Sequence, residues 1–143
     1  PSNLALGQAY MKLSLPKMAA APFRTALKNA KKKDKDKVRL ALSTALSDAG
    51  EHTEAISIFE MLVKKTPSDS KLLFKLALAQ YRGKKADAAV TTLDKVVALE
   101  PSEKRAHLLK AKVYEGEGNL DKAAAAYGAA CDLGDQKACL KSR

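Results

Sequence analysis

The sequence predicts an all-α fold made of repeated helical hairpins, and three observations lead to this fold class. Ala, Leu and Lys, which all favour helices, dominate the 143 residues. No segment alternates apolar and polar residues over the length of a β-strand. Small, apolar and turn-forming residues recur every 34 positions, and such a period is typical of stacked repeat units.

Three consecutive segments of 34 residues, 36–69, 70–103 and 104–137, align without gaps. Their eighth and twentieth positions carry small side chains, which let two helices approach closely. Their twenty-fourth position carries a bulky side chain that fills the remaining space. These positions are, in turn, Ser43, Ala77 and Ala111; Ala55, Ala89 and Ala123; and Phe59, Leu93 and Tyr127.

Each segment divides into two helical patterns separated by a turn that contains glycine. We expect these glycines to adopt the left-handed conformation that ends a helix and reverses the chain. They are Gly50, Gly83 and Gly118. Pro67 and Pro101 follow the second helix of their segments, where they stop it, and Asp135 takes the same position in the last segment. Neighbouring Ser and Asp residues suit the cap of the next helix.

A looser copy of the unit is expected at about residues 1–33. It is marked by Leu6, Gly7, Tyr10, Ala19, Phe23 and Ala26. Pro16 suits the turn between its helices, whereas Pro22 falls inside the second helix, where a proline can bend it.

The first unit is 36 rather than 34 residues from the next, and the two extra residues fall in the connection "KNAKKKDKDK", residues 28–37. This connection carries much of the formal net charge of +10. Two interpretations stay open: a solvated loop whose field is diluted by Asp34 and Asp36, or a contact with a polyanion.

The order Leu-Gly-x-x-Tyr, Ala, Phe/Tyr, Ala and Pro at a 34-residue period resembles the tetratricopeptide repeat. The resemblance covers the whole chain. It implies a right-handed α-solenoid forming a single domain, 1–143, and we expect that domain to be part of a longer protein. Its units would be repeats at about 1–33, 36–69, 70–103 and 104–137, followed by a capping helix at 138–143.

In this family the first helices of the repeats line a concave groove that binds peptides or partner helices. Carried over to this chain, the resemblance implies a basic strip around an apolar and aromatic centre, suited to an acidic partner with apolar anchors. The expected groove residues are Lys37, Leu40, Thr44, Lys71, Phe74, Lys75, Leu78, Tyr81, Arg82, Arg105, Leu108 and Lys112, and the first unit adds Gln8 and Met11. For Leu40, Leu78 and Leu108, ordinary packing between hairpins is the alternative interpretation.

The residues that enzymes use are not arranged here in a recognisable constellation. His52 and His107 lie in no nucleophile–base pattern, and two His with two Cys do not form a zinc-finger spacing. We therefore expect a non-catalytic protein-interaction scaffold without a cofactor or metal. The rival functions are binding of nucleic acid, which the low number of aromatic residues makes a poor match, and self-assembly. Because the tail can cap the last repeat, we expect a monomer.

Both cysteines of the chain, Cys131 and Cys139, lie near the C-terminus on either side of Gly134. A bend at the glycine can bring them close together, but the spacing alone does not distinguish a disulfide from two buried thiols. The segment "ACDLGDQKAC" resembles the junction of bacterial cysteine-rich Sel-like repeats, whose cysteines at this spacing form disulfides between helices. The resemblance therefore implies a disulfide between Cys131 and Cys139.

A disulfide favours an oxidising compartment. Together with the bacterial resemblance of the tail, it predicts a periplasmic or cell-envelope location, with the cytoplasm as the alternative. Envelope assembly, secretion and motility are the processes in which such a scaffold is expected.

Overall fold

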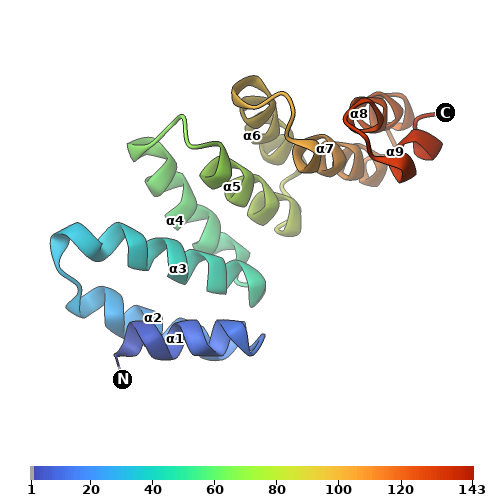
Figure 1. Cartoon of the computed structure of the whole chain (residues 1–143). Coiled ribbons are helices and arrows are strands. Elements are labelled where there is room, and N and C mark those ends of the chain that lie inside the picture. The colour runs from blue at the N-terminus through green and yellow to red at the C-terminus, as the bar shows by residue number, and fades with distance from the viewer. Residues whose placement is uncertain (1) are drawn as a thin grey trace. The chain divides into compact units, whose positions relative to one another are not determined.

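The computed structural model describes residues 2–143. Helices account for the regular structure of this part of the chain, and no strand occurs in it (Figure 1). The helices form consecutive antiparallel hairpins, so the predicted all-α solenoid class is confirmed. The chain divides into two compact units at Thr66 and Pro67.

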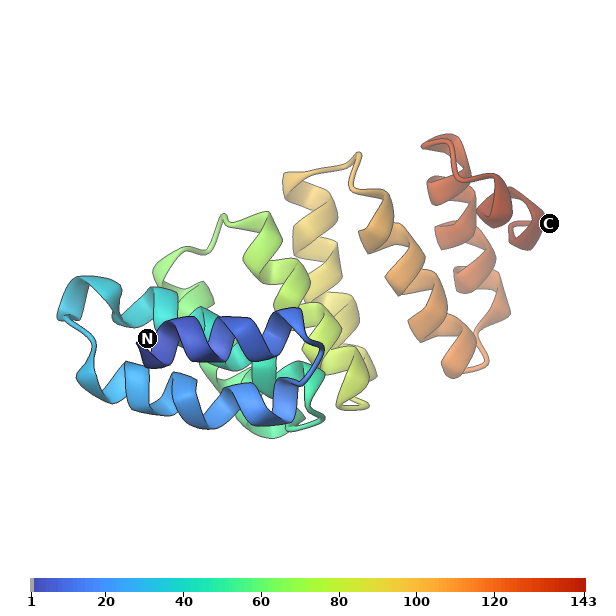
Figure 2. The same ribbon diagram turned by 60° about the horizontal axis from the view of Figure 1, so that its bottom comes forward.

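The first unit contains two helical hairpins joined by a short 3-10 turn. Its elements are α1 (Asn3–Lys12), α2 (Pro16–Asn29), η1 (Lys32–Asp34), α3 (Lys35–Asp48) and α4 (His52–Lys65). Each helix packs against the next, and α1 also contacts α3 (Figures 1 and 2). The helices α1 and α3 are thus neighbouring first helices, with α2 packed against both.

The α1–α2 hairpin is held by a close approach at Gly7. A Cβ atom at this position would lie 2.5 Å from an edge carbon of the Phe23 ring. Phe23 itself is 1% exposed. The α1–α2 packing therefore leaves no room for a side chain at Gly7.

The helix α2 contains two prolines with different consequences. Pro16 occupies the first turn, where the missing N–H would have no helical partner anyway. Pro22 lies inside α2, as the sequence predicted, and the helix continues through it. Because proline has no N–H, the carbonyl oxygen of Met18 lacks its usual partner four residues later.

Two ion pairs connect different helices of the first unit. Arg24 of α2 donates to both carboxylate oxygens of Glu54 of α4, at 2.6 and 2.7 Å. Asp36, at the start of α3, accepts from Lys65 at the end of α4 at 3.0 Å and from Arg39 at 2.8 Å. These hydrogen bonds hold the pKa values of Glu54 and Asp36 below their usual range.

The second unit contains two further hairpins and a short final helix. Its elements are α5 (Ser70–Arg82), α6 (Ala86–Leu99), α7 (Lys104–Gly116), α8 (Leu120–Asp132) and α9 (Gln136–Lys141). Each packs against the next along the chain, and α5 also contacts α7. Three of these helices begin at acidic caps: the side chains of Asp69, Glu103 and Asp135 accept backbone N–H groups of α5, α7 and α9.

The expectation for the turn glycines is right at two positions and wrong at the third. Gly50 and Gly118 have φ values of +90° and +76°. At the turn after α5, Gly83 keeps a φ of −81° and Lys84 takes the left-handed conformation, with a φ of 61°. The left-handed residue follows one position after the glycine because α5 ends with Gly83 as its C-cap.

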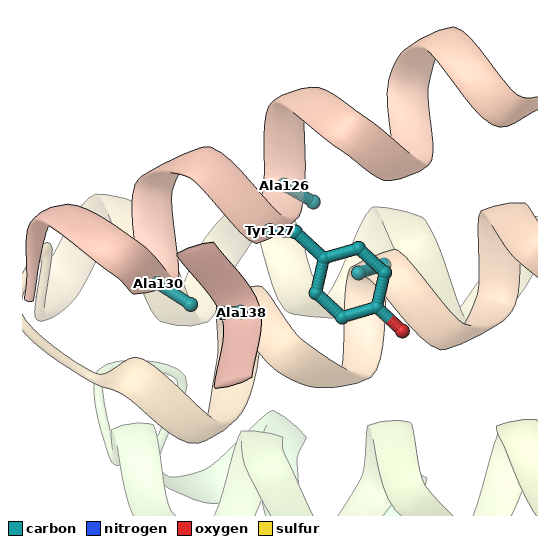
Figure 3. Packing of buried hydrophobic residues seen from close by; sticks show 5 residues of the cluster. Ala126, Tyr127, Ala130 and Ala138 are labelled. Carbon is teal, nitrogen blue, oxygen red and sulfur yellow. The ribbon is translucent and has the colours of Figure 1, made fainter. Parts of the chain in front are cut away.

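The final helix lies against α8 and is fixed by a disulfide between Cys131 and Cys139, whose Cα atoms are 4.7 Å apart. Ala138 of α9 is 1% exposed and packs with the apolar cluster shown in Figure 3. The helix spans 136–141, two residues earlier than the predicted cap, because the Asp135 side chain accepts from the N–H of Ala138 at 2.9 Å. The Asp135 cap and the disulfide together hold α9 against the end of the last hairpin.

Candidate partner-binding surfaces

In the second unit, the predicted groove residues of α5 recur at helical spacing. Positions three or four residues apart lie on one side of a helix. The same holds for those of α7, and α5 and α7 contact one another. We call this surface the α5–α7 face; its residues are Lys71, Phe74, Lys75, Leu78, Tyr81 and Arg82 of α5, and Arg105, Leu108 and Lys112 of α7.

A stacked pair joins the two helices of the α5–α7 face. The guanidinium carbon of Arg105 lies 4.7 Å from the centre of the Phe74 ring, within the range of a cation–π contact. Glu103 accepts from Arg105 Nε at 3.1 Å and from a terminal nitrogen at 3.2 Å. These hydrogen bonds raise the pKa of Arg105 and lower that of Glu103. Arg105 is therefore held over the ring from two sides.

Exposure divides the α5–α7 face into an apolar centre and a basic margin. Phe74 and Leu78 are half-buried, and Tyr81 is 37% exposed, although tyrosine is a large and partly apolar residue. Three lysines of the same face are exposed: Lys71, Lys75 and Lys112. The face thus combines reachable aromatic surface with positive charge.

Leu108 differs from the rest of the set. It is half-buried and packs against the buried cluster of Ala111, Ala126, Tyr127, Ala130 and Ala138. These contacts lie within the α7–α8 hairpin and the final helix α9.

The same buried cluster contains an acid–phenol contact. Tyr127 is 4% exposed, and its hydroxyl donates to a carboxylate oxygen of Glu115. Burial, followed by this hydrogen bond, raises the pKa of Tyr127 to about 12. Figure 3 shows the ring of Tyr127 among the alanines of the cluster.

The predicted residues of the first unit, Lys37, Leu40 and Thr44, do not share one hollow. Thr44 lines a hollow of about 460 Å³ between α1 and α3, and its hydroxyl donates to the carbonyl of Leu40 at 2.9 Å. Lys37 lines a separate cavity nearer the start of both helices. Leu40 is half-buried and lines neither of these hollows.

The hollow beside Thr44 also contains Gln8 and Met11 of α1, which the family pattern places on the inward side of the first repeat. Lys12 and Ala41 complete the walls of the hollow, and Phe23 of α2 also lines it. The only sequence signal for Phe23 was that it stands at the position of the repeat that carries a bulky side chain. Its access to the hollow depends on Gly7, because a side chain there would displace the ring.

The described residues do not form a recognisable metal or membrane element. No group of three or more His, Cys, Asp and Glu side chains within residues 2–143 is placed to hold a metal ion. In the same range, no helix is both long and apolar enough to cross a bilayer. His107 makes a 3.0 Å hydrogen bond with the carbonyl of Pro101, which gives it a local structural partner.

Known structures share the fold of this chain. The structure described as "MamA MSR-1 C2" has a TM-score of 0.80 and 22% identity, over 92% of this chain and 74% of that one. "Crystal structure of MamA" gives 0.79 and 23%, over 96% and 79%. "MamA 41-end from Desulfovibrio magneticus RS-1" gives 0.79 and 22%, over 92% and 73%. At these identities the likeness concerns the fold alone.

Comparison with curated proteins finds no match. Three family models described as "Tetratricopeptide repeat" match residues 4–70, 46–113 and 104–133. Their matches overlap or follow each other along all four hairpins, in agreement with the repeated helix pairs of the structure. The chain therefore belongs to the tetratricopeptide repeat family.

Proposed function

We propose that this chain is a non-catalytic scaffold that binds a peptide or helix of another protein along the first helices of its repeats. The observation that carries the proposal is the stacked Phe74–Arg105 pair on the α5–α7 face. A ring that is partly exposed and held by a cation suits an apolar anchor of a partner. The lysines around it suit acidic residues.

The chemistry of these side chains predicts which of them supply affinity and which orient the partner. Aromatic and Arg residues near the centre of an interface carry most of the affinity, whereas charges at its margin mainly guide association. Phe74 and Tyr81 would therefore anchor the partner. Lys71, Lys75 and Lys112 would orient it.

The hollow beside Thr44 gives the first unit a smaller surface of the same kind. It combines a methionine, an aromatic ring and one lysine, Lys12, between two first helices. Methionine adapts its shape to varied apolar partners. We propose that this hollow takes an apolar side chain of a partner.

A display library of twelve-residue peptides, selected on the whole chain, tests the proposal. Selected peptides should be rich in Asp and Glu around an apolar residue. Truncating two anchors with Phe74→Ala/Tyr81→Ala should weaken their binding by about 30-fold or more, the effect of losing about 2 kcal/mol. The matched control is Leu99→Ala/Leu120→Ala, which removes exposed apolar side chains from α6 and α8 of the same unit.

Two results would contradict the proposal. One is selected peptides without acidic residues. The other is an equal loss of affinity in the control variant, because that would place the binding energy outside the first helices.

The disulfide supports an oxidising environment for the chain. We propose a bacterial periplasm or cell envelope, with a role in envelope assembly, secretion or motility. Labelling of free thiols in freshly lysed source cells tests this location. Two labelled cysteines per chain would favour the cytoplasm.

A further inference from the structure

A second cavity of the first unit is unlike the hollow beside Thr44. It has a volume of about 610 Å³ and lies where the starts of α1 and α3 meet the end of α2. Three lysines line it: Lys31, Lys33 and Lys37. We call it the lysine cavity. Its volume falls in the range of small-molecule sites, roughly 300–1,000 Å³.

The positive charge of the lysine cavity is largely uncompensated. Asp36, which lies among these lysines in the sequence, is turned to other partners, since it accepts from Lys65 and Arg39. Asp34 is the single acidic residue in the lining. Three lysines against one aspartate leave a net lining charge of two positive units, and among the described residues no carboxylate lies within ion-pair distance of Lys31, Lys33 or Lys37.

The cavity is built by the irregular part of the repeat. Lys31 and Lys33 belong to the connection that lengthens the spacing from 34 to 36 residues. The corresponding connections of the second unit end in acidic caps, Asp69 and Glu103, that bind the next helix. Here Asp34 occupies the cap position of α3 without a side-chain cap hydrogen bond. The connection therefore departs from the repeat both in length and in chemistry.

The remaining lining contains neutral donors and an apolar wall. Ser2, Asn3 and Asn29 contribute hydroxyl and amide groups, whereas Leu4 and Val38 contribute apolar surface. Lysine binds phosphate as a mobile point charge, and amides and hydroxyls can donate to the remaining phosphate oxygens. An anion with several negative charges fits this lining better than a single carboxylate, because three ammonium groups are available.

We propose that the lysine cavity binds a phosphate-bearing anion with two or more negative charges. Lys31, Lys33 and Lys37 supply the charge, and Asn29 supplies an amide donor. This assigns Lys37 to an anion site rather than to the peptide surface. The proposal does not depend on peptide binding, since every residue involved belongs to the junction of α1, α2 and α3.

Calorimetric titration of the whole chain with inorganic tripolyphosphate tests the proposal. Replacing the lining lysines, in Lys31→Gln/Lys33→Gln/Lys37→Gln, should weaken binding by about tenfold or more, as expected for the loss of several charge-assisted contacts. The matched control is Lys28→Gln/Lys32→Gln/Lys35→Gln. It removes the same number of positive charges from the same segment, residues 28–37, but changes no residue that lines the cavity. The control should keep most of the affinity.

A second arm identifies the source of the phosphate. Sedimentation with vesicles of phosphatidylglycerol and phosphatidylcholine, compared with vesicles of phosphatidylcholine alone, reports on lipid headgroups. In either arm, a loss of binding in Lys31→Gln/Lys33→Gln/Lys37→Gln that the control variant does not share supports the proposal. A selective loss with vesicles identifies a lipid headgroup, and a selective loss with tripolyphosphate identifies a soluble phosphate. Equal losses in the two variants, or the absence of binding in both arms, would overturn it.

Discussion

Gly7 shows how a single residue decides the packing of the first hairpin. Gly7→Ala should lower the free energy of unfolding by about 1–3 kcal/mol, because the new methyl group would meet the Phe23 ring and force it to move. Urea unfolding followed by circular dichroism measures the change. Gly116→Ala is the control, since nothing lies within 4 Å of a Cβ at that helical position. A loss as large in Gly116→Ala would show that space around Gly7 is not the cause.

Tyr127 gives the second unit an alkaline limit of stability. Its folded pKa is about 12, above the ordinary value of 10.0. The folded state therefore binds the phenol proton more tightly than the unfolded state does. The resulting contribution to the free energy of unfolding is complete below pH 10 and is lost as the pH rises towards 12. It amounts to something on the order of 2 kcal/mol.

Comparison with Tyr127→Phe checks this pH dependence. Between pH 10 and 12, the free energy of unfolding of the wild type should fall more than that of the variant. The increase in phenolate absorbance near pH 12, which comes from Tyr127, should be missing from the variant. Identical alkaline stability curves for both proteins would contradict the account.

At the residue scale, the sequence predicted side chains that repeat and missed those that depend on local geometry. The alanines at position twenty, Ala55, Ala89 and Ala123, are all buried as expected. Gly83 was expected to adopt a positive φ, but Lys84 does so instead. Which of two neighbouring residues takes a turn conformation depends on where the helix ends, and glycine content does not determine that.

At the scale of elements, the disulfide and the Asp135 cap hold the short helix α9. A six-residue helix is too short to be stable alone. Cys139→Ser should therefore release α9 and lower the free energy of unfolding by about 2 kcal/mol through loss of the closed loop. Hydrogen exchange of the Ala138 amide should accelerate, while exchange in α5 and α6 stays unchanged.

Asp135→Ala is the matched variant for α9. It removes the cap hydrogen bond and keeps the disulfide. It should cost about 1 kcal/mol, the usual effect of losing an N-cap. Unchanged protection of Ala138 in Cys139→Ser would show that the disulfide is not needed to hold α9.

Helices were predictable at this scale because their signals are local and periodic. The turns after α3 and α7 were marked by Gly50 and Gly118, and α9 by the residues that follow Gly134. The disulfide followed from a resemblance, since spacing alone left two buried thiols as an alternative. The lysine cavity could not be predicted, because it needs the ends of three helices and the pairing of Asp36 with Lys65.

For the whole molecule, repeat period and family agree with the structure, whereas the partner is not encoded in either. The residues of the α5–α7 face followed from the resemblance, whereas the position of Arg105 over the ring of Phe74, 31 positions away in the sequence, came only from the structure. A single domain, a monomeric state and a lack of nucleic-acid binding stay predictions. Sedimentation equilibrium at several concentrations should give the mass of one chain, 15.3 kDa, and a larger mass would favour self-assembly.

The central claim is that partners bind to the first helices of the repeats and not to the second ones. Hydrogen–deuterium exchange of the whole chain, with and without a selected acidic peptide, tests it most directly. The account predicts slower exchange in α5 and α7, and in α1 and α3 for peptides that also reach the first unit. Protection confined to α6 and α8, or no protection under saturating peptide, would contradict it.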